Sequence, residues 1–106
     1  MKINEKNAKN LFMRLFPSGE GKDYAGRLML CSEYGNNSSS YGWNIDHILP
    51  REKNGSNEIV NLQCTNIITN LNKGAKTTWE DVGYIWQVKR IKGNRKKHAV
   101  KKVKEA

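Results

Sequence analysis

Cysteine is scarce in this sequence, and its scarcity excludes two common ways of stabilising a small protein. The chain contains only Cys31 and Cys64, which lie far apart with no second cysteine near either. Neither a disulfide framework nor a four-cysteine zinc site can be built from this spacing. We therefore expect two reduced and mostly buried thiols, and a Cys31–Cys64 bridge is the alternative that the sequence leaves open.

Aromatic residues and long apolar runs are also few. Hydrophobic residues make up 37% and aromatic residues 8% of the 106 residues. A chain of this length buries only about 60 to 65% of its surface on folding, so we expect one small domain with a thin core. No apolar run approaches the roughly 18 to 20 residues of a membrane span, and the first residues lack the apolar core of a signal peptide. We expect a cytoplasmic protein without a membrane partner.

Positive charge, in contrast, is abundant and unevenly distributed. The net charge is +9, and residues 89–106 hold nine Lys and Arg residues against one acidic residue. Such a run attracts polyanions, which makes nucleic acid the expected partner. The alternative is a solvated, partly disordered extension that only aids solubility. We accordingly divide the chain into a domain over residues 1–91 and a basic tail over residues 92–106 that can be disordered.

Apolar periodicity predicts an α+β protein. Apolar residues recur at three- and four-residue steps over residues 4–16, as in an amphipathic helix. Thr65 or Asn66 can cap a second helix that continues to Gly74. We expect this helix to pack its apolar residues, Ile67, Ile68 and Leu71, inward. Strands are expected, from β-branched and aromatic content between turn signals, at residues 26–31, 41–48, 59–64 and 84–90.

The residues that can carry chemistry lie between Trp43 and Lys76. Asp46 and His47 stand at the end of a predicted strand, and Asn70 lies on the helix that follows. A carboxylate and an amide oxygen can hold a divalent ion such as Mg²⁺, while the imidazole stays free to take a proton from water. An Asp-His pair alone is a weak signal, because such dipeptides arise by chance. The spacing of all three residues is what favours a hydrolytic site.

At these positions the sequence resembles the HNH family of nucleases, whose motif runs D-H-I-x-P, a Gly-rich loop, N-L-Q and N-x-x-K-G. The match covers about a third of the chain. Residues 23–27, 41–43 and 87–90 look like the flanks of small phage and bacterial HNH proteins. The positions that fit the motif are Asp46, His47, Ile48, Pro50, Gly55, Asn61, Leu62, Gln63, Asn70, Lys73 and Gly74.

The resemblance implies a ββα-metal fold with its core motif over residues 41–76, an N-terminal helix and extra flanking strands. In the family scheme, Asp46 and Asn70 bind one divalent ion. His47 is then the general base that activates water, and the products carry 5′-phosphate and 3′-hydroxyl ends. Asn61, the middle residue of the motif, is implied to brace the loop that orients His47, and we group it with His47 as catalytic.

The sequence departs from the family pattern in three places. Asn66 and Thr69 stand where many relatives have zinc-binding cysteines, so no structural zinc is expected. Asn70 stands where others have histidine, which favours Mg²⁺ or Mn²⁺ without excluding other divalent ions. Asn54-Gly55 replaces the usual Gly-Gly, and Asn tolerates the left-handed backbone expected there.

Basic residues near the motif and in the tail are candidates for contacts with DNA. Those around the motif can bind phosphates or stabilise charge in the transition state, with ordinary solvated surface charge as an equal alternative. Those in the tail would add a salt-dependent attraction to the DNA backbone. The predicted nucleic-acid-binding residues are Arg51, Lys73, Lys76, Lys89, Arg90, Lys92, Arg95, Lys96 and Lys97.

The sequence thus predicts a metal-dependent endonuclease that hydrolyses double-stranded DNA, by nicking or with weak sequence specificity. Such a protein would be a monomer or homodimer in a bacterial cell, encoded by the host or by a phage, with phage packaging proteins as candidate partners. The alternative is a non-catalytic DNA-binding or phage packaging accessory protein. In that protein the ββα unit would dock in a groove and the tail would hold the backbone.

Overall fold

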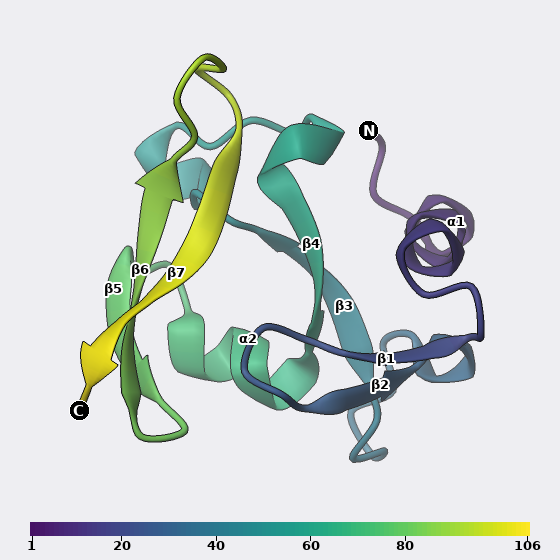
Figure 1. Ribbon diagram of the computed structural model, residues 1–106. Helices are drawn as coiled ribbons and strands as arrows, with labels where there is room; N and C mark the ends of the chain where they lie inside the picture. Colours follow the sequence, from purple (N-terminus) through teal and green to yellow (C-terminus); the bar gives the residue numbers. More distant parts are fainter.

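The computed structural model describes residues 1–106 and contains two α-helices and seven strands (Figure 1). The strands form three small antiparallel sheets. The two-stranded sheets pair β1 (Glu20–Lys22) with β2 (Leu28–Leu30) and β3 (Trp43–His47) with β4 (Leu62–Asn66). The third sheet is described below. The predicted α+β class is confirmed. No helix in the chain is long and apolar enough to cross a membrane.

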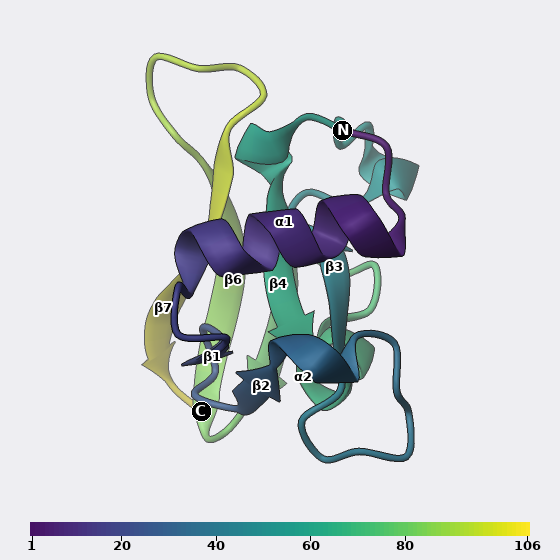
Figure 2. The same ribbon diagram turned by 90° about the vertical axis from the view of Figure 1, so that its right-hand side faces the viewer.

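The N-terminal helix, α1 (Glu5–Leu15), forms as predicted and covers the main core. The Asn4 side chain caps it by accepting a hydrogen bond from the backbone N–H of Asn7 at 2.8 Å. Figure 2 shows α1 lying across the β3–β4 hairpin. Its buried Phe12 stacks on Trp43 of β3, with ring centroids 4.6 Å apart. This contact holds one face of the hairpin and leaves the other face to the second helix.

The β3–β4 hairpin leads directly into α2 (Ile67–Lys73), in the order that the sequence predicts. Asn66 is the N-cap, since its side chain accepts from the backbone N–H of Ile68 at 3.0 Å. The predicted start of the returning strand at residue 59 is wrong. Residues Ile59–Asn61 form a 3-10 turn, and β4 begins at Leu62. The turn forms because the Asn61 N–H donates to the Glu58 carbonyl at 2.9 Å.

The predicted inward packing of the apolar residues of α2 is wrong for Ile68 and Leu71, which face solvent, whereas Ile67 is half-buried. Ile68 and Leu71 are 48% and 75% exposed, whereas Thr69 and Lys73 are completely buried. Polar partners inside the molecule account for this arrangement. Arg27 donates to the Thr69 hydroxyl at 2.9 Å, and Lys73 reaches a buried carboxylate described below. Hydrogen bonds and ion pairs therefore attach α2 to the rest of the protein.

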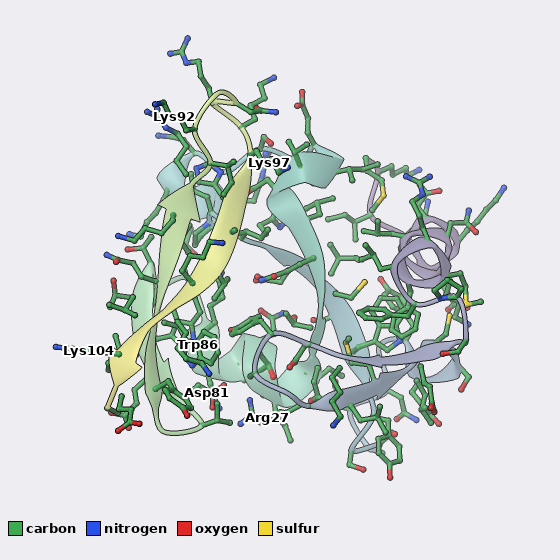
Figure 3. All side chains as sticks on the ribbon, viewed as in Figure 1. Arg27, Asp81, Trp86, Lys92, Lys97 and Lys104 are labelled. Carbon is green, nitrogen blue, oxygen red and sulfur yellow. The ribbon has the colours of Figure 1, made fainter.

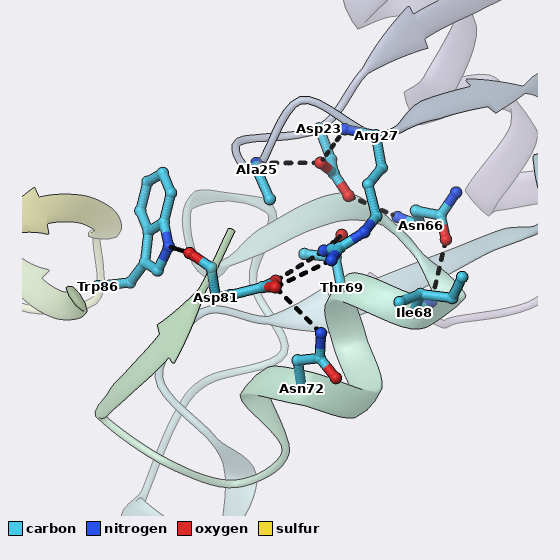
Figure 4. A network of polar contacts seen from close by, with 9 residues as sticks. All are labelled: Asp23, Ala25, Arg27, Asn66, Ile68, Thr69, Asn72, Asp81 and Trp86. Carbon is cyan, nitrogen blue, oxygen red and sulfur yellow. Dashed lines mark hydrogen bonds and ion pairs between the residues drawn. The ribbon is translucent and has the colours of Figure 1, made fainter. Parts of the chain in front are cut away.

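Arg27 and Asp81 form the ion pair that ties α2 to the third sheet (Figure 4). Two guanidinium nitrogens of Arg27 donate to the two Asp81 carboxylate oxygens at 2.6 and 2.9 Å. Asn72 of α2 also donates to Asp81, at 3.0 Å. This bidentate contact holds the pKa of the Asp81 carboxyl below its ordinary value. The pair thus stabilises the junction between three separate elements of the fold.

The third sheet has the order β5 (Thr78–Asp81), β6 (Tyr84–Arg90) and β7 (His98–Glu105). The strand predicted at residues 84–90 is confirmed as β6, whereas β5 was not predicted. The prediction of a separate basic tail that can be disordered is wrong for β7, which pairs with the whole length of β6. Lys102 explains part of this order, because its ammonium lies 3.9 Å from the Tyr84 ring centroid. Aromatic side chains on β6 thereby hold part of the basic strand.

Both cysteines are free thiols, as predicted. Cys64 lies in the core beneath α1, and Cys31 is half-buried at its margin. Burial raises the pKa of the Cys64 thiol to about 12, which keeps it protonated and unreactive at neutral pH. These residues act as small core side chains.

Candidate active site

The residues that the sequence singled out meet at one hollow of about 330 Å³. Asp46 and His47 reach it from the end of β3, and Asn70 reaches it from α2. Arg51, from the turn that follows β3, lines the same hollow. Because β3 and α2 are fixed to each other through a common hairpin, residues 24 positions apart in the sequence face one space. We call this space the catalytic hollow, after the function proposed for it below.

Asp46 is a buried carboxylate with only 4% of its surface exposed. One oxygen is 3.3 Å from the Lys73 ammonium, and the other accepts a hydrogen bond from the Gln63 amide at 2.9 Å. Burial raises the pKa of the Asp46 carboxyl above its ordinary value, and Lys73 and Gln63 offset only part of that shift. A second cation at this carboxylate would favour its ionised form further.

Lys73 is the partner of Asp46 and cannot serve as a surface contact for DNA. Its side chain is 1% exposed, and its ammonium also donates to the backbone carbonyl of His47 at 3.0 Å. The same ammonium lies over the Trp79 ring in a cation–π contact, 5.6 Å from the ring centroid. The predicted phosphate contact by Lys73 is therefore wrong. The structure instead assigns Lys73 to fixing Asp46 and the end of β3.

His47 is half-buried, and its ring is oriented by Asn57. The imidazole Nε2 lies 2.8 Å from the Asn57 side-chain oxygen. That oxygen can only accept, because the Asn57 amide nitrogen donates to the carbonyl of Met1 at 2.6 Å. Neutral His47 must then carry its proton on Nε2, which leaves Nδ1 with a free lone pair. The ring is thus held in the tautomer that a proton acceptor needs.

Asn61 is completely buried and ties together the loop between β3 and β4. Its side-chain oxygen accepts from the backbone N–H of Leu49 at 2.9 Å. Its amide nitrogen donates to the carbonyls of Leu49 and Ser56 at 3.1 and 2.9 Å. The side chain makes no contact with His47 itself. Its bonds hold the loop that carries Asn57, so any effect on the imidazole is indirect.

The tip of this loop has the backbone expected from its Asn-Gly pair. Asn54 is left-handed, with φ of 68°. Gly55 is buried against the Leu49 carbonyl, so that no Cβ fits there. Arg51 closes the same loop by donating to the Gly55 carbonyl at 2.9 Å. The loop is compact because its glycine allows this close approach.

Asn70 presents an amide oxygen that has no hydrogen-bond donor within the chain. Its nitrogen donates to the side-chain oxygen of Asn44 on β3 at 2.8 Å. This contact fixes the amide plane and leaves the Asn70 oxygen available to a ligand. Asp46 and Asn70 therefore offer the catalytic hollow a carboxylate and a neutral oxygen, which are ligand types that Mg²⁺ and Mn²⁺ accept. These residues fit a hard divalent ion whose remaining ligands are water and substrate.

The other predicted DNA contacts divide into two groups. Arg51 is exposed and lines the hollow, and Lys76 is exposed and follows Ala75, which also lines it. The second group lies on β6 and the turn that follows it, at a distance in sequence from the motif. In that group Lys96 is partly occupied, since its ammonium pairs with Glu58 at 2.8 Å. The members of the second group are Lys89, Arg90, Lys92, Arg95, Lys96 and Lys97.

Sequence reasoning assigned no role in the site to three residues that support it, namely Asn57, Gln63 and Asn44. Each acts through one hydrogen bond to His47, Asp46 or Asn70. Gln63 and Asn44 could have been found from strand alternation, because Asn44 and Asp46 share one face of β3 and Gln63 is paired with Asp46. Asn57 gave no such signal, because it lies in an irregular loop. No family model, curated protein or solved structure matches this chain.

Proposed function

We propose that this protein is a metal-dependent endonuclease that hydrolyses phosphodiester bonds in double-stranded DNA, with the ββα-metal architecture of the HNH family. The observation that carries the proposal is the meeting of Asp46, His47 and Asn70 at one hollow. The order β3, β4, α2 supports the ββα reading. The net charge of +9 supports a polyanionic substrate.

In the proposed mechanism, Asp46 and Asn70 would hold one divalent ion, Mg²⁺ or Mn²⁺. When bound, the ion would neutralise charge on the scissile phosphate and on the departing 3′ oxygen. The Asn44 amide and the Lys73 ammonium would keep these two ligands in place. Products with 5′-phosphate and 3′-hydroxyl ends are what the resemblance to the HNH family implies.

His47 would supply the base. Its Nδ1 lone pair accepts a proton from the attacking water, and the positive charge that develops on the ring is shared with the Asn57 oxygen through Nε2–H. Asn61 would hold the loop that carries Asn57. Arg51, which lines the same hollow, is available to stabilise negative charge on the phosphate. One such site cuts one strand at a time, so nicking is the expected activity.

Relaxation of a supercoiled plasmid tests the proposal. Purified protein with Mg²⁺ should convert supercoiled plasmid to the nicked form, and addition of EDTA should stop the reaction. His47→Ala should lower the rate by about 10²-fold to 10⁴-fold, the usual contribution of a general base, and should still bind DNA. His98→Ala is the matched control, because His98 lies at the start of β7 and its ring has one hydrogen-bond contact, with the Lys96 carbonyl. Equal rates for the two variants would contradict the mechanism.

A non-catalytic DNA-binding function is the second candidate, and the contacts of Asp46 favour it. Both carboxylate oxygens already have partners, Lys73 and Gln63, so a metal ion must share the carboxylate with a lysine ammonium. In this case the ββα unit would dock on DNA, and the chain could act as a DNA-binding or phage packaging accessory protein. Duplex binding that is unchanged by EDTA, with no nicking by Mg²⁺, Mn²⁺ or other divalent ions, would favour this second function.

A further inference from the structure

The turn between β6 and β7 presents cationic side chains that have no partner within the chain. Lys92, Arg95 and Lys97 are exposed, and none of them forms an ion pair or a side-chain hydrogen bond. Arg90, at the end of β6, is also exposed and unpaired. No acidic residue occurs between positions 89 and 104 to neutralise them. We call residues 91–97 the basic turn.

The basic turn has a defined backbone. The N–H of Ile91 donates to the carbonyl of Lys97 at 2.9 Å, which closes the turn at its base. At its tip, the Asn94 side chain accepts from the N–H of Lys96 at 3.0 Å, and Gly93 supplies a left-handed φ of 91°. A turn held in this way presents its charged side chains on a fixed support, which lowers the entropy lost on binding.

Three of these cations line a separate hollow of about 410 Å³. Arg90, Lys92 and Arg95 contribute to its wall, and the rest of the wall comes from other residues of the turn. Two guanidinium groups and one ammonium around one space are suited to a phosphate, because guanidinium donates two parallel hydrogen bonds to phosphate oxygens. None of the residues of the catalytic hollow takes part.

We propose that this hollow binds backbone phosphates of duplex DNA, at positions other than the bond that is cut. The proposal rests on the proposed function and deepens it by giving the substrate a second point of attachment. Figure 3 shows Lys92 and Lys97 at the end of the β6–β7 hairpin, where the hairpin projects from the body of the protein. A two-stranded antiparallel ribbon fits the major groove of duplex DNA, which is about 12 Å wide. The projecting hairpin can therefore follow the duplex while its turn holds backbone phosphates.

The salt dependence of DNA binding tests this site. Binding of a 20-base-pair duplex should be measured in EDTA, from about 50 to 200 mM salt, so that cleavage plays no part. Replacing Arg90, Lys92 and Arg95 together by Gln should reduce the slope of log K against log salt by about 2 to 3, because each lost phosphate contact removes about 0.9. Affinity at about 100 mM salt should fall on the order of 100-fold.

A control with the same loss of charge separates a site from general attraction. Lys6, Arg14 and Lys22 are exposed, unpaired and remote in sequence from the hairpin, and their triple replacement by Gln should change the slope by less than about 1. Equal losses in the two triple variants would overturn the proposal, and so would an unchanged slope in the first. An RNA duplex of the same sequence should bind more weakly. Tighter binding of that RNA duplex would overturn the assignment to DNA. Unfolding of both variants, followed by tryptophan fluorescence, should match the original protein.

Nicking assays distinguish failure of this site from failure of the proposed activity. When the nicking rate is measured against plasmid concentration, the triple variant of the basic turn should keep its kcat and show a raised KM. His47→Ala should lose kcat, and its DNA binding should keep the salt slope of the original protein. If the original protein nicks no DNA but the slope falls as expected, the phosphate site stands without the enzyme. If nicking is observed and the slope does not move, the enzyme stands without this site.

Discussion

Two polar connections in this protein differ in the partners of their side chains. One is the loop between β3 and β4, and the other is the basic turn between β6 and β7. In the first loop, the side chain of the fully buried Asn61 forms hydrogen bonds with the loop backbone. In the second, the backbone closes on itself, and the charged side chains other than Lys96 stay unpaired in solvent. The first loop orients its own side chains, and the second displays them.

The first loop is built to hold side chains in fixed positions, and the basic turn is built to attract an anionic ligand. A side chain that must hold an imidazole needs fixed neighbours, and the Asn61 and Asn57 contacts supply them. A side chain that must neutralise a phosphate gains more from being free of internal partners, because it has no ion pair to break on binding. Changes in the first loop should therefore act on stability and turnover, and changes in the basic turn should act on affinity.

The largest effect on the free energy of unfolding is expected from Asn61→Ala. The substitution removes the fully buried Asn61 side chain, which is the partner of the Leu49 N–H and of the Leu49 and Ser56 carbonyls, and should lower the free energy of unfolding by about 3 kcal/mol. Urea unfolding followed by tryptophan fluorescence measures this change. Asn37→Ala is the control, because Asn37 is exposed and makes no side-chain hydrogen bond. A loss below about 1 kcal/mol for Asn61→Ala would show that the loop is held by other contacts.

A smaller effect is expected from Asp81→Asn, which weakens the attachment of the third sheet to α2. Arg27 lowers the pKa of Asp81 in the folded state, so this carboxylate stabilises the fold above its ordinary pKa of 3.8 and loses that contribution as the pH falls below it. Asp81→Asn should cost about 2 kcal/mol at pH 7 and flatten the fall in stability between about pH 5 and pH 2. Unfolding measured across this range checks both. An equally steep fall in the variant would assign the acid sensitivity to other carboxylates.

The smallest effect is expected from Asn57→Ala, which leaves His47 free to rotate and to change its tautomer. In the nicking assay kcat should fall about 10-fold, or about 1.4 kcal/mol in the barrier, with KM unchanged. Asn94→Ala, at the tip of the basic turn, should do the opposite and raise KM while leaving kcat as it was. Should both variants change the same parameter, the contrast between the two loops would not hold.

The sequence was sufficient to find the catalytic hollow but not the way its residues are held. The meeting of Asp46, His47 and Asn70 could be predicted because local patterns reveal a strand end and a helix cap. Asn66 does cap α2. The burial of Lys73 could not be predicted in the same way. It depends on a carboxylate 27 residues away, and propensity rules carry no information about that partner.

Two errors have a common physical cause, which is that hydrophobic pattern is a weak guide where polar contacts decide the packing. The apolar residues of α2 suggested an inward face, but the bonds of Thr69 and Lys73 fixed the helix the other way round. The lysines of residues 98–105 suggested a solvated tail, but pairing with β6 and the contact of Lys102 with Tyr84 order them. Both outcomes depend on residues distant in sequence.

The position of β7 has one more consequence, which concerns how copies of the protein meet. It is an edge strand, and an edge strand offers unpaired backbone groups to any strand that approaches. Lys101, Lys102 and Lys104 lie along it, so a second copy arriving edge to edge would bring like charges together. The same lysine-rich sequence that makes the chain basic thus protects it against β-aggregation.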